Sequence, residues 1–500
     1  MPQLNNKNLK NSISELTDRE QTITSGNYDR AQIQSGIVHF GVGNFHRCHQ
    51  AVYIDKLLNQ GAKDWGIIGV SMRSTKIRDA LKPQNFLYTE VTLGTQSSFR
   101  IIGSILDILV APENPTAVIS QVAENQIKLV TTTITEKGYY LSSGQINQRH
   151  PDIVADKTCL EKPRTIYGYL AASIIQRAIQ GSAPLSIICC DNIQAGGAHL
   201  RAGVYMLLQV HAQQLLNWVE EHVSFASSMV DRVSPATDNS LKNLVHSALK
   251  LKDVWPVSAE PFSQWVIENK FAGPKPALDK VGAIFADDIS YHQQMKLRFL
   301  NAGHSIIAVL AYLTGHKTIH QALEQPYILQ FVQRALCENI LPVTEIPQGY
   351  QGKDYIAEVI QRFQNSALPY FAQQVNSDSS QKIILRWFPS IDNALLKNTD
   401  TAFMSFIVAA WVVYVERALD ANELNDPLDH HLMKANQKNV QTVEQFLTII
   451  GASHFNFTAS ARFMTDVTNA YQTLTDINIS NALSDFLTKN TSQPKELDHA

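Results

Sequence analysis

Cysteine is scarce in this sequence, and no two cysteines have the spacing of a redox or zinc motif. The chain has 500 residues and 5 cysteines, none of them in a CxxC pair. An odd number without that spacing argues against a disulfide framework and a zinc ribbon, and is typical of a reducing compartment. The polar N-terminus, MPQLNNKNLK, contains no apolar segment of a secretory signal. We therefore expect a cytoplasmic protein.

Excess charge and long apolar runs are also missing. Lys and Arg number 42, Asp and Glu number 45, and the formal net charge is -3. Such a balance provides no strong field for nucleic acid or an anionic membrane surface. No uninterrupted run of about 18 apolar residues occurs, and stretches such as Ile306 to Leu313 are short. We expect a small-molecule substrate, no nucleic-acid or membrane partner, and a monomer or small homo-oligomer.

The two halves of the chain differ in pattern. Before about residue 290, short apolar segments alternate with amphipathic helical ones, which is typical of a parallel sheet covered on both faces. The strand candidates are residues 36–45, 65–73, 99–110, 127–135 and 185–190, and the clearest helix between them is Thr165 to Gly181. Later segments have the 3.6-residue period of helices. We predict an α/β domain over residues 1–288 and a mainly α-helical substrate and catalytic domain over residues 289–500.

A glycine pair lies where a dinucleotide-binding loop belongs. Gly41 and Gly43 follow the first apolar segment and precede a helical one that begins near Asn44 and Phe45. In a Rossmann-type domain the first glycine permits the tight turn, and the second lets the backbone approach a pyrophosphate at the helix N-terminus. The third glycine of the motif is replaced by His46. An ordinary strand-to-helix turn therefore remains an alternative.

The end of the second strand bears on the choice between NAD and NADP. An acid there binds the free ribose 2′-hydroxyl of NAD, whereas basic residues accommodate a 2′-phosphate. Here the segment ends at Arg73, Lys76 follows, and the nearest acid is Asp79. We expect NAD, but these basic residues leave NADP open, and they could equally be solvated surface charges.

A second candidate site lies in the segment MKLRFLNAGHS. Lys296 is followed by Asn301 and His304, and on a regular α-helix the three fall within an arc of about 140°. The neighbouring residues are apolar, and burial lowers the pKa of a lysine, so that it can act as a base. Amide and imidazole groups can stabilise a developing alkoxide. The alternative is a lysine that extends to solvent from a buried helix.

Several long motifs resemble one family. They are GVGNFHRCHQAVYIDKLL, TITEKGY, CDNIQAGG, SMVDRVSP, EPFSQWVIENKF, MKLRFLNAGHS and SSQK, in that order between about Gly36 and Leu419. In these motifs the chain resembles the polyol-specific long-chain dehydrogenases, which include mannitol 2-dehydrogenase and fructuronate (D-mannonate) reductase. The resemblance implies a Rossmann-type N-terminal domain, a helical C-terminal domain, an active site between them and metal-free hydride transfer.

The resemblance also implies roles for individual residues. Lys296 is the expected general acid and base, and Asn301, His304 and Asn192 are expected to hold the reacting oxygen. The expected cofactor-binding residues are Gly41, Gly43, Asn44, Phe45, Arg73 and Asp231, and the expected substrate-binding residues are Lys382 and Glu136. Each has a structural alternative: Asn192 could cap a turn, Asp231 could pair with Arg232, and Lys382 could be solvated. His46 and His49 have the spacing of metal ligands, but we expect no metal site.

Two departures from the family leave the proton route and the substrate open. The family often has a glutamate three residues before the lysine, where this chain has Gln293, and His292 could take its place. Mannitol dehydrogenases tend to have an arginine where this chain has Gln374, and this glutamine together with Lys137 is more similar to fructuronate reductases. Both mannitol/fructose and mannonate/fructuronate therefore remain possible substrate pairs.

We accordingly expect reversible hydride transfer between a nicotinamide cofactor and a secondary alcohol of a linear polyol or sugar acid. Two other functions remain open. A non-catalytic nucleotide- or sugar-binding member of the family would bind the cofactor without turnover. A Rossmann-type methyltransferase would explain the glycine loop but not the helix with Lys296, Asn301 and His304.

Overall fold

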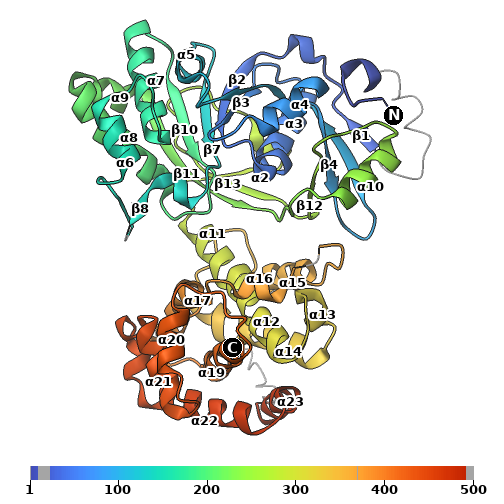
Figure 1. The fold of residues 1–500 in the computed structure, drawn as a ribbon, viewed down its shortest axis with the longest axis vertical. Coiled ribbons are helices and arrows are strands. Elements are labelled where there is room, and N and C mark those ends of the chain that lie inside the picture. Colours follow the sequence, from blue (N-terminus) through green and yellow to red (C-terminus); the bar gives the residue numbers. More distant parts are fainter. Residues whose placement is uncertain (1, 10–22, 143, 369, 491–500) are drawn as a thin grey trace, which may run out of the picture. The chain divides into compact units, whose positions relative to one another are not determined.

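The computed structural model describes residues 2–9, 23–142, 144–368 and 370–490. The chain divides into two compact units, Met1–Ile289 and Ser290–Ala500 (Figure 1). The first unit contains the sheets with their covering helices, and the second is built from helices.

An eight-stranded sheet forms the centre of the first unit. Its order is β14-β13-β11-β10-β7-β2-β3-β6. The strands are β2 (Ser35–Phe40), β3 (Gly66–Ser71), β6 (Ile105–Val110), β7 (Leu129–Thr132), β10 (Leu185–Cys189), β11 (Val223–Asp231), β13 (Gln264–Glu268) and β14 (Ile284–Ala286). From β6 to β11 all neighbours are parallel, while β13 pairs antiparallel with β11. The chain runs outward from β2 in both directions, which is the Rossmann order and confirms the predicted fold class.

Helices cover both faces of this sheet because inward-facing residues alternate along its strands. In β2, Val38 and Phe40 face a cluster that includes residues of α5 (Pro115–Ala123), α7 (Ile166–Gln180) and α8 (Gly196–His211). Ile37 faces the opposite cluster, which includes α3 (Gln50–Asn59) and α4 (Lys76–Leu81). The predicted helix from Thr165 to Gly181 is α7, with the Thr165 side chain as its N-cap and Gly181 as its left-handed C-cap.

Two predicted segments are divided in the structure. The strand predicted over residues 99–110 is β5 (Ser98–Ile102) and β6, and β5 belongs to a second sheet of order β1-β5-β4-β12. The break falls at Gly103, whose amide donates to Asp55 Oδ1 across 2.9 Å. The helix predicted after the glycine loop is likewise two helices, α2 (Asn44–Cys48) and α3, because His49 leaves the helical conformation.

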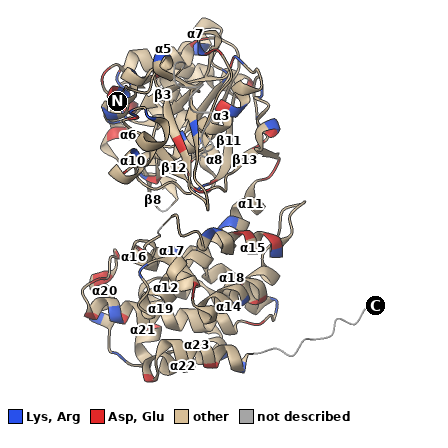
Figure 2. Ribbon diagram, turned by 90° about the vertical axis from the view of Figure 1, so that its right-hand side faces the viewer, with Lys and Arg blue, Asp and Glu red and all other residues tan. Residues whose placement is uncertain are grey.

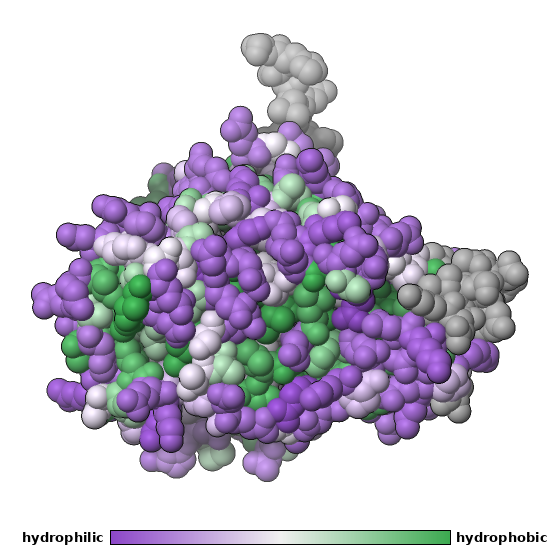
Figure 3. Space-filling model, turned by 90° about the horizontal axis from the view of Figure 1, so that it is seen from above, coloured by the Kyte–Doolittle hydropathy of each residue, from purple (hydrophilic) through white to green (hydrophobic). Residues whose placement is uncertain are grey.

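The remaining elements of the first unit are short. They are β1 (Ile23–Ser25), β4 (Tyr88–Thr92), β8 (Leu141–Ser142), β9 (Gln145–Ile146), β12 (Val257–Ala259), α6 (Pro151–Thr158), α9 (Leu216–His222) and α10 (Asn239–Leu249). Seen from above, hydrophilic side chains dominate the surface, with apolar ones exposed between them (Figure 3). Lysine, arginine and acidic residues are interspersed along the described chain (Figure 2).

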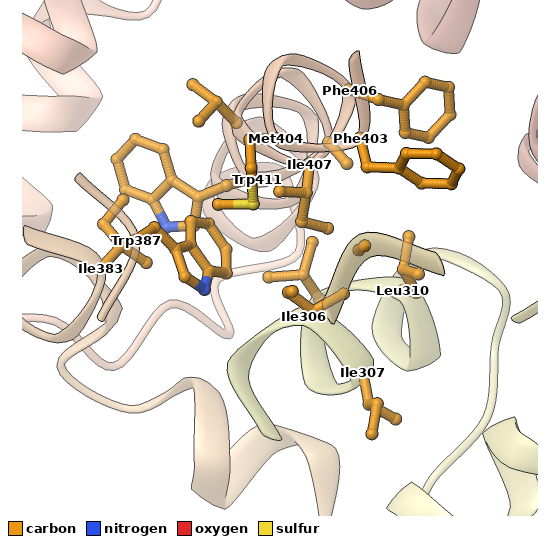
Figure 4. Close-up of a cluster of buried hydrophobic side chains, with 14 of the residues drawn as sticks. Ile306, Ile307, Leu310, Ile383, Trp387, Phe403, Met404, Phe406, Ile407 and Trp411 are labelled. Carbon is orange, nitrogen blue, oxygen red and sulfur yellow. The ribbon is translucent and has the colours of Figure 1, made fainter. Parts of the chain in front are cut away.

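The second unit is helical, as its sequence period predicts. Its helices are α11 (Ser290–Met295), α12 (Ala302–Leu313), α13 (Ile319–Leu323), α14 (Pro326–Arg334), α15 (Gly352–Phe363), α16 (Ala372–Asn376), α17 (Ser379–Arg386), α18 (Phe388–Leu396), α19 (Ala402–Asp420), α20 (Asp429–Ala435), α21 (Val440–Ile449), α22 (Ala461–Asp476) and α23 (Ile479–Lys489). Ile306 of α12, Trp387 and Ile407 of α19 belong to one core cluster (Figure 4).

Helix α19 is the most apolar long helix among the described residues. It is long and apolar enough to cross a membrane by length and composition, although the sequence contains no uninterrupted apolar run of that length. In the structure, 83% of its most apolar stretch is buried. It contacts α12, α20, α21 and α22, and it therefore has the surroundings of a core helix.

Candidate active site

The glycine loop leads from β2 into α2, and its backbone fits a pyrophosphate. Gly41 has φ of 102°, and a Cβ there would lie 2.0 Å from the carbonyl oxygen of Thr133, so only glycine suits this position. A Cβ at Gly43 would meet nothing within 4 Å. No side chain caps α2, and the amides of Asn44, Phe45 and His46 have no acceptor in the described part of the chain. These amides can receive the cofactor's phosphates.

Buried polar contacts fix the start of α2. Asn44 Nδ2 donates to the carbonyl of Pro235 across 3.1 Å, and Arg47 Nη2 donates to Asn44 Oδ1 across 2.7 Å. Arg47 is 1% exposed, lies over the rings of Tyr88 and Trp255, and donates to the Trp255 carbonyl across 2.6 Å. Burial lowers the pKa of Arg47 to about 10. The side chain of Asn44 is therefore engaged within the protein, and its backbone amide is the group left to meet a ligand.

His46, which replaces the third glycine, stacks on His39 of β2. Their ring centroids are 3.4 Å apart with an interplanar angle of 13°. His39 Nδ1 lies 2.7 Å from Thr131 Oγ1, and burial lowers the pKa of His39 to about 3. Burial also lowers the pKa of His46 well below its usual value. Both imidazoles are therefore neutral, and the close helix–strand approach that a third glycine usually permits is made here by two stacked rings.

The neighbouring strands place other predicted residues at the same edge of the sheet. Asn192 follows β10 and is exposed, and Glu136 follows β7 and is also exposed. Between them lies Asp191, which accepts from Tyr139 Oη across 2.6 Å and from the Thr135 amide across 2.8 Å. Burial raises the pKa of Asp191. This network connects the two loops and fixes the backbone from which Asn192 projects.

The ends of β3 and β11 carry the remaining cofactor candidates. Arg73 is exposed just beyond β3, while the nearby Arg78 forms an ion pair with Glu113. Asp231 is the last residue of β11 and is buried. Arg232 forms its ion pair with Glu90 and not the pair with Asp231 suggested from the sequence. Arg232 Nη2 donates to Glu90 Oε1 across 2.8 Å.

In the second unit the candidate lysine lies on an unusual helical turn. Lys296–Asn301 is a π-helix between α11 and α12, and the Ala302 amide donates to the Leu297 carbonyl five residues back. The regular α-helix assumed from the sequence is therefore wrong here. On a regular α-helix, five residues separate Lys296 and Asn301 by about 140° around the helix axis. A π turn closes after about five residues, so the angle between these two side chains is smaller and they lie on the same face. Lys296 is 9% exposed.

His304 is three residues beyond Asn301 and is surrounded by aromatic and cationic groups. Its ring centroid is 5.3 Å from that of Phe363 and 5.0 Å from that of Tyr370. Burial lowers the pKa of His304 to about 3, and the positive charges of Arg386 and Lys382 lower it further. Its buried Nε2 has no hydrogen-bond partner among the described residues. A neutral imidazole with an unused nitrogen is suited to bind a substrate oxygen rather than to transfer a proton.

Lys382 lies on α17 and connects this helix to α16. Its Nζ donates to the Val375 carbonyl across 3.1 Å and also to that of Ser377. Burial lowers the pKa of Lys382, and Arg386 adds to the effect. The positive charges of Lys382 and Arg386 therefore act on the ring of His304.

Two residues of this region were missed from the sequence. Asp426 accepts from the Ser380 amide across 2.9 Å and from Ser380 Oγ across 2.5 Å, so it fixes the SSQK segment at the start of α17. Arg386 donates to the carbonyl of Asn301 across 3.2 Å. Arg386 could have been found because it follows Lys382 by one helical turn, whereas no local pattern connects Asp426 to Ser380.

Comparisons with known proteins cover both units. The model of the mannitol dehydrogenase Rossmann domain matches residues 35–280, and that of the mannitol dehydrogenase C-terminal domain matches residues 288–475. The chain belongs to the mannitol dehydrogenase family. This assignment confirms the resemblance stated from the motifs and the predicted enzyme class, a dehydrogenase with a nicotinamide-binding Rossmann domain.

Individual relatives match over nearly their whole length. A mannitol 2-dehydrogenase of Aspergillus oryzae is 33% identical, over 94% of this chain and 96% of its own. The solved Pseudomonas fluorescens mannitol 2-dehydrogenase, a ternary complex with NAD and D-mannitol, has a TM-score of 0.80 and 31% identity over 97% of this chain and all of its own. A substrate-free D-sorbitol dehydrogenase has a TM-score of 0.85 and 26% identity, over 92% and 97%. The NAD in the ternary complex agrees with the predicted cofactor.

Proposed function

We propose that this protein is an NAD-dependent mannitol 2-dehydrogenase that oxidises the C2 hydroxyl of D-mannitol to the ketone of fructose and works reversibly. The observation that carries the proposal is the match of both units to a relative solved with NAD and D-mannitol. The glycine loop supports it independently, since its free amides and the open space at Gly43 suit a dinucleotide.

In this proposal Lys296 is the general base for oxidation and the general acid for reduction. Lys296 is 9% exposed, and Met295 and Phe299, which are close to it in sequence, are fully buried. Burial of a lysine favours its neutral amine. The neutral amine takes the proton of the C2 hydroxyl. Bound NAD supplies the acceptor for the C2 hydride. In the reverse direction the ammonium of Lys296 returns the proton to the ketone oxygen.

The reacting oxygen is held by groups that donate hydrogen bonds without changing charge. Asn301 lies on the same face as Lys296, and His304 presents an imidazole that stays neutral because of its burial. Asn192, on the first unit, has the same role by family resemblance. Donors fixed in place before the reaction stabilise an alkoxide-like oxygen, and removing one of them lowers turnover by about a hundredfold.

We also propose that the reaction needs no metal ion. The lysine supplies proton transfer, and within the described ranges no group of three or more His, Cys, Asp and Glu side chains is arranged to hold a metal. The ring of His46 stacks on that of His39, and His49 Nε2 lies 2.9 Å from the Gln264 carbonyl. Turnover that persists after dialysis against a chelator is the expected result.

A sugar acid is the second candidate substrate, favoured by Gln374 where mannitol dehydrogenases tend to have arginine. Absorbance at 340 nm distinguishes the candidates. Purified protein is given NADH or NADPH with fructose, fructuronate and tagaturonate, and NAD with the matching polyols and aldonates. Turnover with fructose and mannitol supports the proposal, and turnover with a uronate alone replaces it with a sugar-acid reductase. NADH binding without any turnover identifies a non-catalytic member of the family.

A further inference from the structure

The π-helical turn at Lys296–Asn301 determines how the three candidate catalytic side chains are spaced. Helical turns with hydrogen bonds to the fifth residue are rare, occur mostly as single turns inside α-helices and are frequent at functional sites. The return to α-helical geometry comes at Asn301 and Ala302, the last π residue and the first residue of α12. If this junction moved by one residue, Asn301 and His304 would rotate away from Lys296.

Two consecutive side chains bind this junction. Arg386 Nη1 donates to the Asn301 carbonyl across 3.2 Å and to Ser305 Oγ across 2.6 Å. Trp387 Nε1 donates to the Ala302 carbonyl across 3.3 Å. A carbonyl oxygen has two lone pairs, so each can accept a side-chain donor beside its helical bond. The carbonyls of Asn301 and Ala302, on the two sides of the junction, are thus the ones that accept these side-chain hydrogen bonds.

The donors themselves are held by the core. Trp387 is fully buried and belongs to the cluster of Ile306, Ile383 and Trp411 (Figure 4). Arg386 ends α17, the helix that also carries Lys382. The contacts therefore connect the rigid interior of the second unit to the helix that carries the catalytic groups.

We propose that Arg386 and Trp387 are positioning residues, which hold the junction between the π turn and α12 and so fix the spacing of Lys296, Asn301 and His304. The expected loss of turnover rests on the proposed function, whereas the expected faster amide exchange at the junction does not. Donors misplaced by about 1 Å reduce turnover by about a hundredfold, whereas binding of the cofactor to the first unit does not depend on this junction.

The test uses the full-length protein in three variants. Arg386→Met keeps the length of the side chain and removes its donors, Arg386→Lys keeps a donor and the charge, and Trp387→Phe keeps the ring packing and removes the N–H. Arg417→Met, at an exposed arginine of the same unit, is the matched control. Amide hydrogen exchange of residues 296–305 is measured together with kcat, KM for mannitol and the dissociation constant for NADH.

Arg386→Met is expected to lower kcat by about a hundredfold and to accelerate exchange in residues 296–305, with NADH binding within about twofold of wild type. Trp387→Phe is expected to lower kcat by about fivefold, and Arg386→Lys to lie between Arg386→Met and wild type. Wild-type kcat and exchange in Arg386→Met would overturn the proposal, as would faster exchange across the whole unit, which indicates a merely structural role. If wild type oxidises no polyol, the proposed function fails while the exchange result still decides the positioning role.

Discussion

Arg47 donates a hydrogen bond to Oδ1 of Asn44 across 2.7 Å, and through it the first turn of α2 is held against the loop that follows β11. Replacement of this buried arginine by methionine removes the donor and leaves the Asn44 and Trp255 oxygens without it. Lost hydrogen bonds to a charged group predict a free energy of unfolding lower by about 2 to 3 kcal/mol. Because the amides at the start of α2 would shift, we expect the dissociation constant for NADH to rise about tenfold.

Fluorescence titration with NADH and denaturant unfolding measure the two effects. Arg149→Met, at an exposed arginine of the same unit, is the control and should change neither. Asn44→Ala, which leaves Arg47 in place, should weaken NADH binding with a smaller loss of stability. NADH binding unchanged in Arg47→Met would show that α2 does not need this contact.

Asp426 makes a second prediction, because its carboxylate accepts from both the amide and the hydroxyl of Ser380. Asp426→Ala should release the start of α17 and displace Lys382, which lies on the first turn of that helix. We expect KM for the polyol to rise severalfold while the dissociation constant for NADH stays unchanged, since the glycine loop belongs to the other unit. Loss of a buried capping carboxylate also lowers stability, by about 2 kcal/mol.

Steady-state kinetics and thermal unfolding test this prediction. Asp429→Ala, an exposed acid three residues further on, is the control. An unchanged KM in Asp426→Ala would indicate that Lys382 does not contribute to substrate binding, whatever the loss of stability.

The fold of the first unit was predictable because its evidence is local. Buried parallel strands such as β10 are short apolar runs, and the glycine pair follows directly on β2. The failure at residues 99–110 has a physical cause. The residues of β5 and β6 form one apolar pattern, whereas the change of sheet between them depends on contacts far away in sequence, such as that of Gly103 with Asp55.

The site was predictable only as far as single motifs extend. Lys296, Asn301 and His304 share one segment, but the period of an α-helix could not reveal that the turn between them is a π turn. Asn44 and Pro235, like Ser380 and Asp426, are far apart in sequence and share no motif, so their contacts come from the fold. Asn44 shows the same limit, because its motif position suggests a cofactor ligand while its side chain binds Arg47 and Pro235.

Lys296→Met provides the direct test of the proposed proton transfer. A methionine has similar length and apolar bulk but cannot accept a proton, so kcat for mannitol oxidation should fall by about a hundredfold to ten-thousandfold. NADH binding should persist, since the glycine loop is unchanged. Lys397→Met, at an exposed lysine of the same unit, should retain full activity. Partial recovery of Lys296→Ala by added methylamine would identify the missing group as an amine, whereas near-normal turnover of Lys296→Met would exclude the assignment.

Three neutral histidines predict how stability depends on pH. Burial lowers the pKa of His39 and His304 to about 3 and that of His46 well below its usual value, whereas in the unfolded chain each has a pKa of about 6.5. Below about pH 6.5 the unfolded state therefore binds more protons than the folded state, and stability should fall as the pH falls. The expected slope is about one proton for each histidine.

Burial raises the pKa of Glu90, Asp191 and Asp253, so these carboxyls favour the folded state as the pH falls and oppose the histidines. A comparison of variants isolates the contribution of one histidine to the pH dependence of stability. His304→Gln should reduce the slope of unfolding free energy against pH, between about pH 6.5 and 5, by about one proton. His454→Gln, at an exposed histidine, should leave it as in wild type. An equal slope in His304→Gln and wild type would mean that His304 is protonated in the folded protein, and its role as a neutral donor to the substrate oxygen would then be wrong.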